Sequence, residues 1–536
     1  MKVERPDQVD KAIARTPGSG RSSALVAGGV LLSRLAGLIR LRAFAYYFGL
    51  QSDAADAFNA AFRIPNLLQN LFGEGALSAS FIPVYASLVA RGDRREADRT
   101  AGAVAALLGL VVSTLVLAGV LATPLLIAVV APGFTGEKRA LTITIVRVLF
   151  PGAGLLVLSA WCLGVLNSHR RFLLSYAAPV MWNLAMIGTL VAFGARTPLP
   201  RLAVWLAWGS VVGSALQFAV QVPVVARVAP DVRFALDVAS AHVRAVVANF
   251  VPVLIGRGVV QVSAYVDTVI ASLLPTGAVT GLTNAQVLYT LPVSLFGMSV
   301  AAAELPAMSG EAGSDPASAA ALRVRLDAGL RRIAFFVVPS AVAFLALGDV
   351  IAAALLQTGR FTAADAVYVW SILAGAAIGL LPSTLGRLYS STYFALRDTR
   401  TPLRYALVHV ALATVLGYVF AIVLPPRLGI PAVWGAAGLT AAAGIAGWIE
   451  MLLLRRTLNA RIGPTGLRTG YALKLWMAAS SGAAVAWAVK TALPPLHPIA
   501  TAGLVLGAYG VVFLALALLL RVGESSSALA QLLRRR

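Results

Sequence analysis

The feature that most constrains this chain is a series of apolar segments that recurs from residue 23 to residue 520. Each is about 20 residues or longer, the length that crosses the hydrocarbon core of a membrane as a helix. Lipid leaves no backbone group to be paired by water, so only helices and closed barrels span it. The alternating ten-residue segments of a barrel are absent from the sequence. The chain is therefore predicted to be an all-α polytopic membrane protein.

About 14 transmembrane helices can be delimited in the sequence. Hydrophobic residues make up 59% of the chain and charged residues 12%, which agrees with a protein that lies mostly in lipid. An even number of spans places both termini on one side. The predicted spans are 23–48, 54–90, 101–131, 140–166, 173–194, 202–225, 243–274, 279–308, 332–357, 365–394, 403–424, 429–454, 471–489 and 499–520.

The formal net charge of +22 could suggest a nucleic-acid partner, but the positions of the charges indicate otherwise. Thirty of the 44 Lys and Arg residues lie in the termini and in the loops on the N-terminal side, and seven lie in the opposite loops. Cytoplasmic loops carry such an excess of basic residues. We therefore expect both termini in the cytoplasm, a multi-pass protein and no nucleic-acid partner.

Four basic residues in the first turn of a predicted span are counted above with the adjacent loops, and the seven others inside the spans are all arginines. They are Arg34, Arg40, Arg42, Arg63, Arg147, Arg257 and Arg387. A charge at the bilayer centre costs at least ~2.5–3.5 kcal/mol, so such residues usually face a protein interior or a wet cavity. Arg42 and Arg147, near span ends, fit snorkelling to the interface. The deeper arginines predict a cavity that recognises an anion, because a guanidinium binds phosphate or carboxylate bidentately.

The second predicted span carries a polar stripe. At ~100° per residue, five polar side chains lie within roughly 40° of one line: Asp56, Asn59, Arg63, Asn70 and Glu74. Pro65 removes a backbone donor in the middle of the stripe and predicts a kink or hinge. In the preceding span Gly29, Ser33 and Gly37 have the spacing that lets membrane helices approach closely. The two spans are expected to form one wall of a buried polar cavity.

No motif for catalysis or nucleotide binding is present. The patterns GxxxxGK[ST], HExxH and GxSxG are absent, and Cys162 is the only cysteine. His409 is the only histidine inside a span and is expected to be a packing residue. We therefore expect no catalytic residues, metal or cofactor, and a coupled ion (Na⁺ or H⁺) or the membrane potential as the energy source. Asp267, close to Ser263, is the candidate ion site; the alternative is an ion pair with a neighbouring arginine.

The chain contains a weak internal repeat with offsets of 223 to 227 residues. The matched positions are Arg34 with Arg257, Pro65 with Pro292, Phe72-Gly73 with Phe296-Gly297 and Pro83 with Pro306, and LNSHRRFLLSYAAP is echoed by FALRDTRTPLRYA. This predicts two six-helix lobes in a parallel pseudo-repeat around a central cleft, plus two extra C-terminal helices. Pro65 and Pro292 are the candidate hinges. The predicted divisions are a tail (1–22), lobes 23–230 and 231–456, a final helix pair (457–520) and a basic tail (521–536).

Four stretches together identify a family. SRLAGLIR (33–40), ADAFNAAFRIPNLLQNLFGEGALSASFIPVY (55–85), APGF (131–134) and GRFTAADA (359–366) resemble the MurJ/MviN family of lipid II flippases, within the multidrug/oligosaccharidyl-lipid/polysaccharide exporter superfamily. The resemblance covers essentially the whole chain. It implies an alternating-access protein of the bacterial cytoplasmic (inner) membrane that carries the undecaprenyl-diphosphate-linked disaccharide pentapeptide of peptidoglycan to the outer leaflet. It also implies a groove for the lipid tail on the last two spans.

The resemblance also implies site residues. Arg34 and Arg40 match the paired arginines of the family's first span, Asp56 and Glu74 match its second-span acids, and Arg387 matches a basic residue of its tenth. Two positions depart from the family pattern, since Gln69 and Gln286 stand where members carry arginine. Arg63 and Arg257 could supply cations nearby. The expected substrate-binding set is Arg34, Arg40, Asp56, Arg63, Glu74, Arg257, Gln286 and Arg387.

Other classes of function make different predictions. A multidrug antiporter of the same superfamily should have an acid-dominated cleft, whereas the charges inside these spans are mainly arginines. A membrane-embedded glycosyltransferase should carry acidic metal-binding motifs, and a structural scaffold needs no buried charges. Among flippases, O-antigen or teichoic precursors, or another polyprenyl-linked polysaccharide unit, are the alternative substrates. A monomer in contact with membrane lipids and lipid II is expected.

Overall fold

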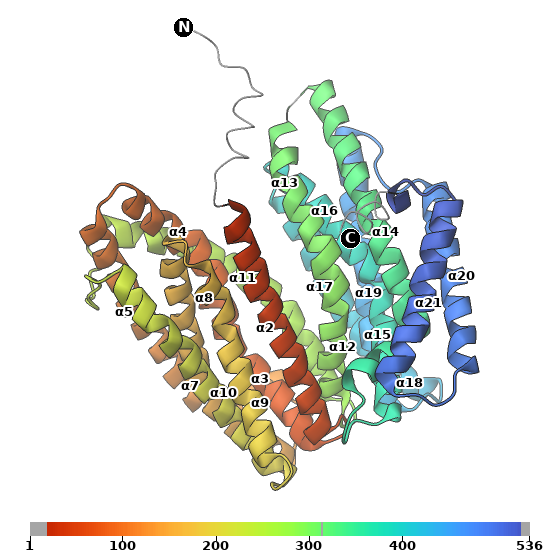
Figure 1. The fold of residues 1–536 in the computed structure, drawn as a ribbon, viewed down its shortest axis with the longest axis horizontal. Coiled ribbons are helices and arrows are strands. Elements are labelled where there is room, and N and C mark those ends of the chain that lie inside the picture. The colour runs from red at the N-terminus through yellow and green to blue at the C-terminus, as the bar shows by residue number, and fades with distance from the viewer. Residues whose placement is uncertain (1–18, 312, 314, 527–536) are drawn as a thin grey trace. The chain divides into compact units, whose positions relative to one another are not determined.

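The computed structural model describes residues 19–311, 313 and 315–526; within them, the side chains of 19–27, 30, 74 and 255–264 are not described. Apart from one isolated bridge between Thr358 and Phe361, every regular element of this part is helical (Figure 1). The helices of the first half are α2 (Ser19–Phe48), α3 (Asp53–Phe72), α4 (Glu74–Ala90), α5 (Arg94–Leu121), α6 (Thr123–Val130), α7 (Gly136–Ser168), α8 (Phe172–Ala177), α9 (Pro179–Phe193), α10 (Leu199–Val228) and α11 (Ala241–Ser272).

The second half is also helical. Its elements are α12 (Ala278–Pro292), the π-helical η1 (Val293–Met298), α13 (Ser299–Glu311), α14 (Pro316–Leu356), α15 (Ala363–Ile378), α16 (Leu380–Ala395), α17 (Arg400–Tyr418), the π-helical η2 (Val419–Val423), α18 (Leu424–Arg427), η3 (Ala432–Trp434), α19 (Gly435–Ile462), α20 (Thr469–Ala492) and α21 (Pro498–Leu519).

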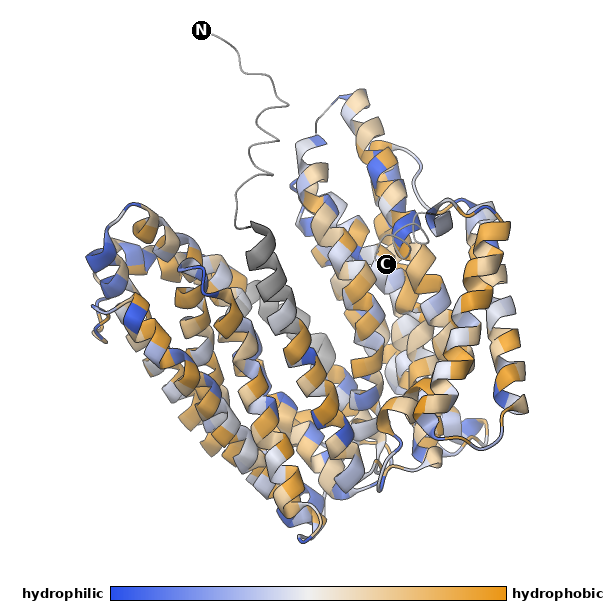
Figure 2. Cartoon of the chain, viewed as in Figure 1, coloured by the Kyte–Doolittle hydropathy of each residue, from blue (hydrophilic) through white to orange (hydrophobic). Residues whose placement is uncertain are grey.

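The all-α membrane class is confirmed. Each predicted span falls on one helix or on a run of consecutive helices. Within the described residues, eleven helical runs are long and apolar enough to cross a membrane, or twelve if the bent pair α15–α16 counts as one span. Figure 2 shows hydrophobic residues along the long helices and hydrophilic residues gathered at many helix ends and loops. The count of fourteen stays a prediction, because α2 and α11 contain the side chains that are not described.

The chain divides into two compact units. The first comprises 1–47, 60–130 and 135–262, and its centre is formed by α7 packed against α10, with α4 and α5 on α7 and α9 on α10. Buried polar contacts join these helices: Trp161 Nε1 donates to the Ala101 carbonyl at 3.1 Å, and Gln217 and Gln221 both donate to Ser159 Oγ. The small-residue face of α2 also lies in this unit, where a β-carbon on Gly29 would come within 2.9 Å of Tyr176.

The second unit comprises 48–59, 131–134 and 263–536 and is organised around α14. This 41-residue helix packs against α15, α16, α20 and α21, while α19 packs against α15, α16 and α17. The last helix pair is anchored to α14 by Tyr509, whose hydroxyl donates to the Pro339 carbonyl at 2.7 Å, and by Lys490, which pairs with Asp349. The predicted lobe boundaries at 230 and 456 stay predictions.

Short polar segments begin several helices. Asp93 accepts from the Glu96 N–H at the start of α5, and Asp315 accepts from the Ser318 N–H at the start of α14, where Pro316 is the first helical residue. Such caps pair backbone donors that a helix leaves open at its N-terminus. They explain why polar loops delimit these apolar helices.

The break in the second predicted span lies elsewhere than expected. We expected an interruption at Pro65, but α3 continues through Pro65 to Phe72 and the chain breaks at Gly73, where φ is −80° and ψ is −155°. A β-carbon at Gly73 would lie 2.1 Å from the Gln69 carbonyl oxygen. The polar stripe is therefore split, because Glu74 begins the next helix. The hinge role of Pro65 stays a prediction.

Candidate functional site

Asp56 lies at the N-terminus of α12. Its Oδ2 accepts from the Gly277 N–H at 2.9 Å, and its Oδ1 accepts from the Thr280 N–H at 2.9 Å and the Thr280 hydroxyl at 2.7 Å. The side chain is 1% exposed. The φ of +98° at Gly277 turns the chain so that these donors converge, a conformation that favours glycine. A carboxylate here pairs open backbone donors and complements the positive end of the helix dipole.

The neighbouring residue of the polar stripe serves the same helix. Asn59 Nδ2 donates to Thr280 Oγ1 at 3.2 Å and to the Ala55 carbonyl at 3.0 Å. Arg63 and Asn70, further along α3, are half-buried and make contacts of their own. The first half of the stripe therefore holds α12, and the predicted substrate-binding role of Asp56 has to be weighed against this structural one. The side chain of Glu74 lies outside the described residues.

Two of the four recognised motifs belong to the same unit. In APGF, the Gly133 N–H donates to Ser272 Oγ at 3.2 Å, and a β-carbon on Gly133 would lie 2.1 Å from the Ser272 carbonyl oxygen. In GRFTAADA, Thr362 and Asp365 form a reciprocal capping box that begins α15. Close backbone approach and helix initiation thus account for these residues.

Arg40 is engaged by α9 within the first unit. Its Nε donates to Asn183 Oδ1 at 3.0 Å, and its guanidinium lies 4.9 Å from the centroid of the Trp182 ring. Asn183 is itself held by a hydrogen bond from its Nδ2 to the Pro179 carbonyl. The face of a planar cation over an aromatic ring is stabilising. The indole nitrogen, Trp182 Nε1, donates in turn to Ser210 Oγ at 3.0 Å.

The other predicted cations differ in exposure. Arg34 on α2 and Arg387 on α16 are exposed in the structure. The side chains of Arg257 and Ser263 lie outside the described residues. Asp267, the candidate ion-binding residue, is half-buried on α11 and makes contacts of its own. Two of the expected anion-binding arginines are therefore exposed.

A small pocket with a mostly apolar lining lies beside Pro65 in the first unit. Its volume is about 20 Å³, room for one or two water molecules. Gln69, one of the two glutamines at family arginine positions, lines it together with Asn66, and α10 contributes Ser210 and Ser214. Pro65 therefore borders a pocket large enough for a water molecule. Substrate contact by Gln69 stays untested.

The second glutamine, Gln286, lies exposed on α12. One turn further along the same helix, the Tyr289 hydroxyl is 2.8 Å from Ser383 Oγ on α16. Pro292 ends α12, and the next six residues, Val293–Met298, form the π-helical turn η1. A π-helical turn often marks a functional position in a helix. The hinge predicted at Pro292 therefore coincides with irregular helical backbone, although its motion is untested.

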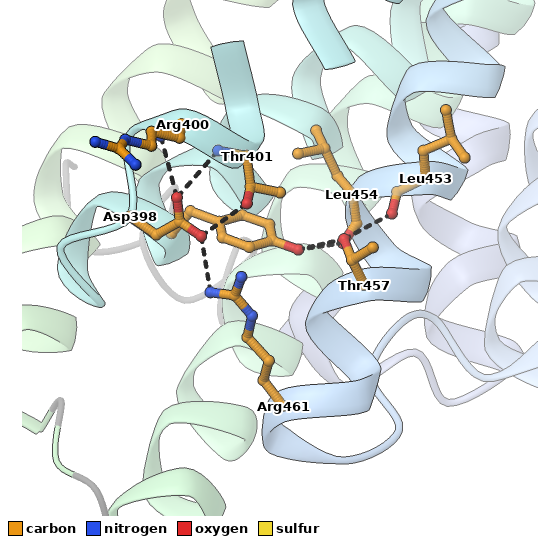
Figure 3. A network of polar contacts seen from close by, with 8 residues as sticks. Asp398, Arg400, Thr401, Leu453, Leu454, Thr457 and Arg461 are labelled. Carbon is orange, nitrogen blue, oxygen red and sulfur yellow. Dashed lines mark hydrogen bonds and ion pairs between the residues drawn. The ribbon is translucent and has the colours of Figure 1, made fainter. Parts of the chain in front are cut away.

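The loop between α16 and α17 contains a polar network (Figure 3). Asp398 accepts from the Thr401 N–H and hydroxyl and from the Arg400 N–H, and Arg461 Nη1 of α19 lies 2.8 Å from Asp398 Oδ2. These hydrogen bonds, with Thr401 the largest contributor, lower the pKa of Asp398 to about 2. The Arg461 guanidinium also lies 5.3 Å from the Tyr393 ring centroid. The network fastens α17 to α19.

Sequence reasoning missed the partners of the polar side chains. It did not identify Gly277 and Thr280 as partners of Asp56. It also did not identify Asn183 and Trp182 as partners of Arg40. A Pro-Thr-Gly turn before the eighth predicted span was the one local signal that α12 begins there. Among the described residues no group of three or more His, Cys, Asp and Glu side chains could hold a metal ion.

Comparisons with known proteins agree with this architecture. A family model described as "Lipid II flippase MurJ" matches residues 44–520. A lipid II flippase MurJ of Burkholderia cenocepacia is 32% identical over 448 residues, which cover 82% of this chain and 84% of that protein. A probable lipid II flippase MurJ of Rhizobium meliloti is 32% identical over 441 residues, covering 81% of this chain and 79% of that protein.

Solved structures show the same fold. A lipid II flippase MurJ in an inward closed conformation superposes with a TM-score of 0.75 at 23% identity, covering 93% of this chain and 99% of the other. A MATE-family multidrug resistance transporter in an inward-facing conformation gives 0.63 at 16% identity, covering 79% and 95%. An outward-facing MATE transporter gives 0.52 at 16% identity, covering 82% and 96%. With the family model spanning almost the entire chain, this protein belongs to the MurJ family of lipid II flippases, membrane transporters of the bacterial cell envelope.

Proposed function

We propose that this chain translocates lipid II, the undecaprenyl-diphosphate-linked disaccharide pentapeptide, from the inner to the outer leaflet of the bacterial cytoplasmic membrane. The observation that carries the proposal is the family match over residues 44–520, together with relatives at about a third identity that are named for this activity. Peptidoglycan synthesis, and through it cell shape, would depend on the transport.

The charges inside the spans support a phosphate-bearing substrate. Moving a diphosphate sugar through hydrocarbon is prohibitive unless polar walls replace its water. Arg34 and Arg387 are exposed arginines within predicted spans, and a guanidinium can bind a diphosphate bidentately. The apolar pair α20–α21 would accommodate the prenyl tail.

The transport cycle we propose is alternating access by a monomer, with both termini in the cytoplasm. The excess of basic residues in loops on the N-terminal side supports this orientation. The fold is shared with transporters solved in inward-facing and outward-facing conformations, which supports the cycle. We expect the energy to come from the membrane potential or from a coupled ion, with Asp267 as the Na⁺ or H⁺ candidate.

The test is complementation. A bacterial host is depleted of its own lipid II flippase, this chain is expressed, and lipid II in the outer leaflet is followed. We expect wild type to restore outer-leaflet lipid II and growth. Arg34→Ala and Arg387→Ala should reduce transport at least tenfold, whereas Arg196→Ala, an exposed arginine in a loop, should transport normally. Failure of a well-expressed wild-type chain to restore outer-leaflet lipid II would overturn the proposal.

The same experiment separates the alternative substrates. A chain that leaves lipid II in the inner leaflet but flips another polyprenyl-diphosphate sugar would be a flippase for a different polysaccharide unit. A chain that instead exports cationic dyes would be a multidrug antiporter, the activity that the MATE-like fold makes the second candidate.

A further inference from the structure

Two titratable side chains face each other inside the second unit, apart from the residues discussed above. His409 lies on α17 and Glu450 lies on α19, and the distance from His409 Nδ1 to Glu450 Oε2 is 3.0 Å. The two side chains are 25% and 26% exposed. The two helices pack along each other, so the pair joins neighbouring spans. Ionisable residues within spans are rare and usually serve a function.

The pair lies deep in both helices. His409 is nine residues from Arg400, where α17 begins, and Glu450 is twelve residues before Ile462, where α19 ends. At 1.5 Å per residue these separations are about 14 and 18 Å. Both helices belong to runs that are apolar and long enough to cross a membrane. The two groups are therefore well removed from the ends of their spans.

The imidazole nitrogen nearest the carboxylate is buried and has no hydrogen-bond partner. It is close enough to Glu450 for an ion pair, yet the two groups are not aligned as donor and acceptor. A β-carbon on Gly447 would lie 3.8 Å from His409 Cε1, so this edge of the ring faces α19. A buried polar atom left unpaired calls for a physical reason. A proton on Nδ1 would supply the missing interaction after a small rotation.

Several other titratable groups on the packed elements are engaged elsewhere or exposed, whereas Tyr368 on α15 is buried and its hydroxyl has no hydrogen-bond partner. Arg455 Nε donates to the Thr465 carbonyl, Asp365 belongs to the capping box of α15, and Tyr289 bonds Ser383. Further titratable groups on α14, α15, α16, α17 and α19 include Asp349, Tyr368, Arg387, Tyr389, Tyr393, Arg404, Tyr405 and Arg456. Asp349 pairs with Lys490, and Arg387 is exposed. Glu450 is the carboxylate that stands next to His409.

We propose that His409 and Glu450 form a proton-binding site whose occupancy is coupled to transport. The incoming proton, delivered by water, binds the Nδ1 lone pair, so that a neutral imidazole beside a carboxylate becomes an imidazolium–carboxylate pair. The net charge of the site changes from −1 to 0, and release of the proton to water restores it. Because the pair joins α17 to α19, the change alters the attraction between two packed spans. The coupling rests on the proposed lipid II transport, whereas proton binding does not.

The first test measures proton binding directly. The full-length protein, labelled with ¹⁵N-histidine and reconstituted in nanodiscs, contains four histidines, so each imidazole can be followed by NMR from pH 5 to pH 9. Glu450→Gln is the test variant and His497→Gln, at the exposed start of α21, is the matched control. We expect the pH response of the His409 signals to differ between wild type and Glu450→Gln, while the signals of the other three histidines respond alike in both proteins. No titration in this range, or an unchanged midpoint, would leave His409 as a packing residue and overturn the proposal.

The second test measures coupling. Lipid II translocation is followed in proteoliposomes between pH 5.5 and pH 8.5 for wild type, His409→Gln, Glu450→Gln and His497→Gln. We expect both site variants to flatten the pH profile by at least threefold across the range, while the control keeps the wild-type profile. Unchanged profiles in well-folded site variants would overturn the coupling. If wild type moves no lipid II at any pH, the proposed function fails, and the NMR titration alone decides whether the pair binds a proton.

Discussion

The loop after α7 and the loop after α16 have the same backbone and different side-chain chemistry. Arg170 and Arg397, 227 positions apart, both have a φ of 58°. In each loop the next residue donates its N–H five residues back, from Arg171 to Leu166 at 2.8 Å and from Asp398 to Tyr393 at 2.9 Å. This is the Schellman helix ending, here with arginine where glycine is usual. The two loops that the sequence repeat pairs therefore share this helix ending, which also occurs at Arg521 after α21, so the repeat itself stays a prediction.

The stabilising partners of the two loops differ. In the first loop, His169 Nε2 is 2.9 Å from the hydroxyl of Tyr85, which is fully buried. In the second loop, Leu396 occupies the position of His169. The stabilising contacts there come from Asp398, which caps α17 and pairs with Arg461. Duplicated backbone thus sets where a turn forms, while the side chains decide how each copy responds to pH.

The second-span helix α3 and its repeat counterpart α12 make the same point at their N-termini. The Ala55 N–H of α3 donates to Ser52 Oγ, a cap three residues away in sequence. The start of α12 has no such local cap and uses Asp56, more than 220 residues away. One helix start is therefore encoded locally and the other depends on tertiary structure.

Replacing the distant cap should have the largest effect. Asp56→Ala leaves two buried N–H groups and the Thr280 hydroxyl proton without this acceptor, so we expect a loss of about 3 kcal/mol of stability and loss of transport. Thermal unfolding in detergent and complementation measure the two effects. The control is Asp53→Ala, whose exposed side chain accepts one hydrogen bond from Thr276. If Asp56→Ala unfolded at the same temperature as this control, capping of α12 by Asp56 would contribute nothing to stability.

The equivalent glycines, Gly73 and Gly297, should respond unequally. A β-carbon at Gly73 would lie 2.1 Å from a backbone oxygen, whereas one at Gly297 would lie 2.9 Å from Thr384 Cγ2, a side-chain atom that can shift. We expect Gly73→Ala to cost about 2–3 kcal/mol and Gly297→Ala about 1 kcal/mol. Gly507→Ala, with open space around it, is the control. Equal unfolding midpoints for the two variants would show that the two breaks are structurally alike.

Removing the polar network around Asp398 should destabilise the protein less than the glycine substitutions. Asp398→Ala removes a helix cap and is expected to lose about 1 kcal/mol, while Arg461→Ala should lose less because a partly exposed ion pair contributes little. The pKa of about 2 for Asp398 lies below the ordinary value near 3.9. The stabilisation is therefore complete above pH ~4 and is lost as the pH falls through about 2. Denaturant unfolding of both variants at pH 7 and pH 3 would test these expectations. A larger loss of stability for Arg461→Ala than for Asp398→Ala would show that the ion pair stabilises the loop more than the helix cap.

The first loop should respond to pH in a different range. Burial lowers the pKa of His169 below its usual value, even though Asp98 acts in the opposite direction. The unfolded chain then takes up the proton at a higher pH than the folded one, so the stabilisation is complete above the ordinary pKa near 6.5 and declines below it. We expect His169→Gln to lose less stability than wild type between pH 7.5 and pH 5.5, measured by unfolding midpoint. Parallel curves would contradict the burial of a neutral His169.

These comparisons also show what the sequence could predict. Apolar length fixed the positions of the helices, and charge asymmetry suggested their orientation, because both depend on local composition. Asp56 and Arg40 were recognised as unusual, but Thr280 and Asn183 were not identified as partners, since a contact across 143 or 224 positions leaves no local pattern. The break at Gly73 was missed because Pro65 is the stronger helix breaker by propensity, whereas the backbone at Gly73 approaches the Gln69 carbonyl so closely that a β-carbon would not fit.

The smallest expected effect concerns the arginines that begin this comparison. A left-handed residue other than glycine is strained, so Arg170→Gly and Arg397→Gly should each raise stability by about 0.5–1 kcal/mol. The gain should be similar in both loops because φ is identical, and it should survive in the Asp398→Ala background, since backbone strain is independent of that cap. Unfolding midpoints of the single and double variants measure this. A gain in one loop alone would mean that one arginine side chain makes a stabilising contact that offsets its strain, and the two loops would then differ in energy as well as in chemistry.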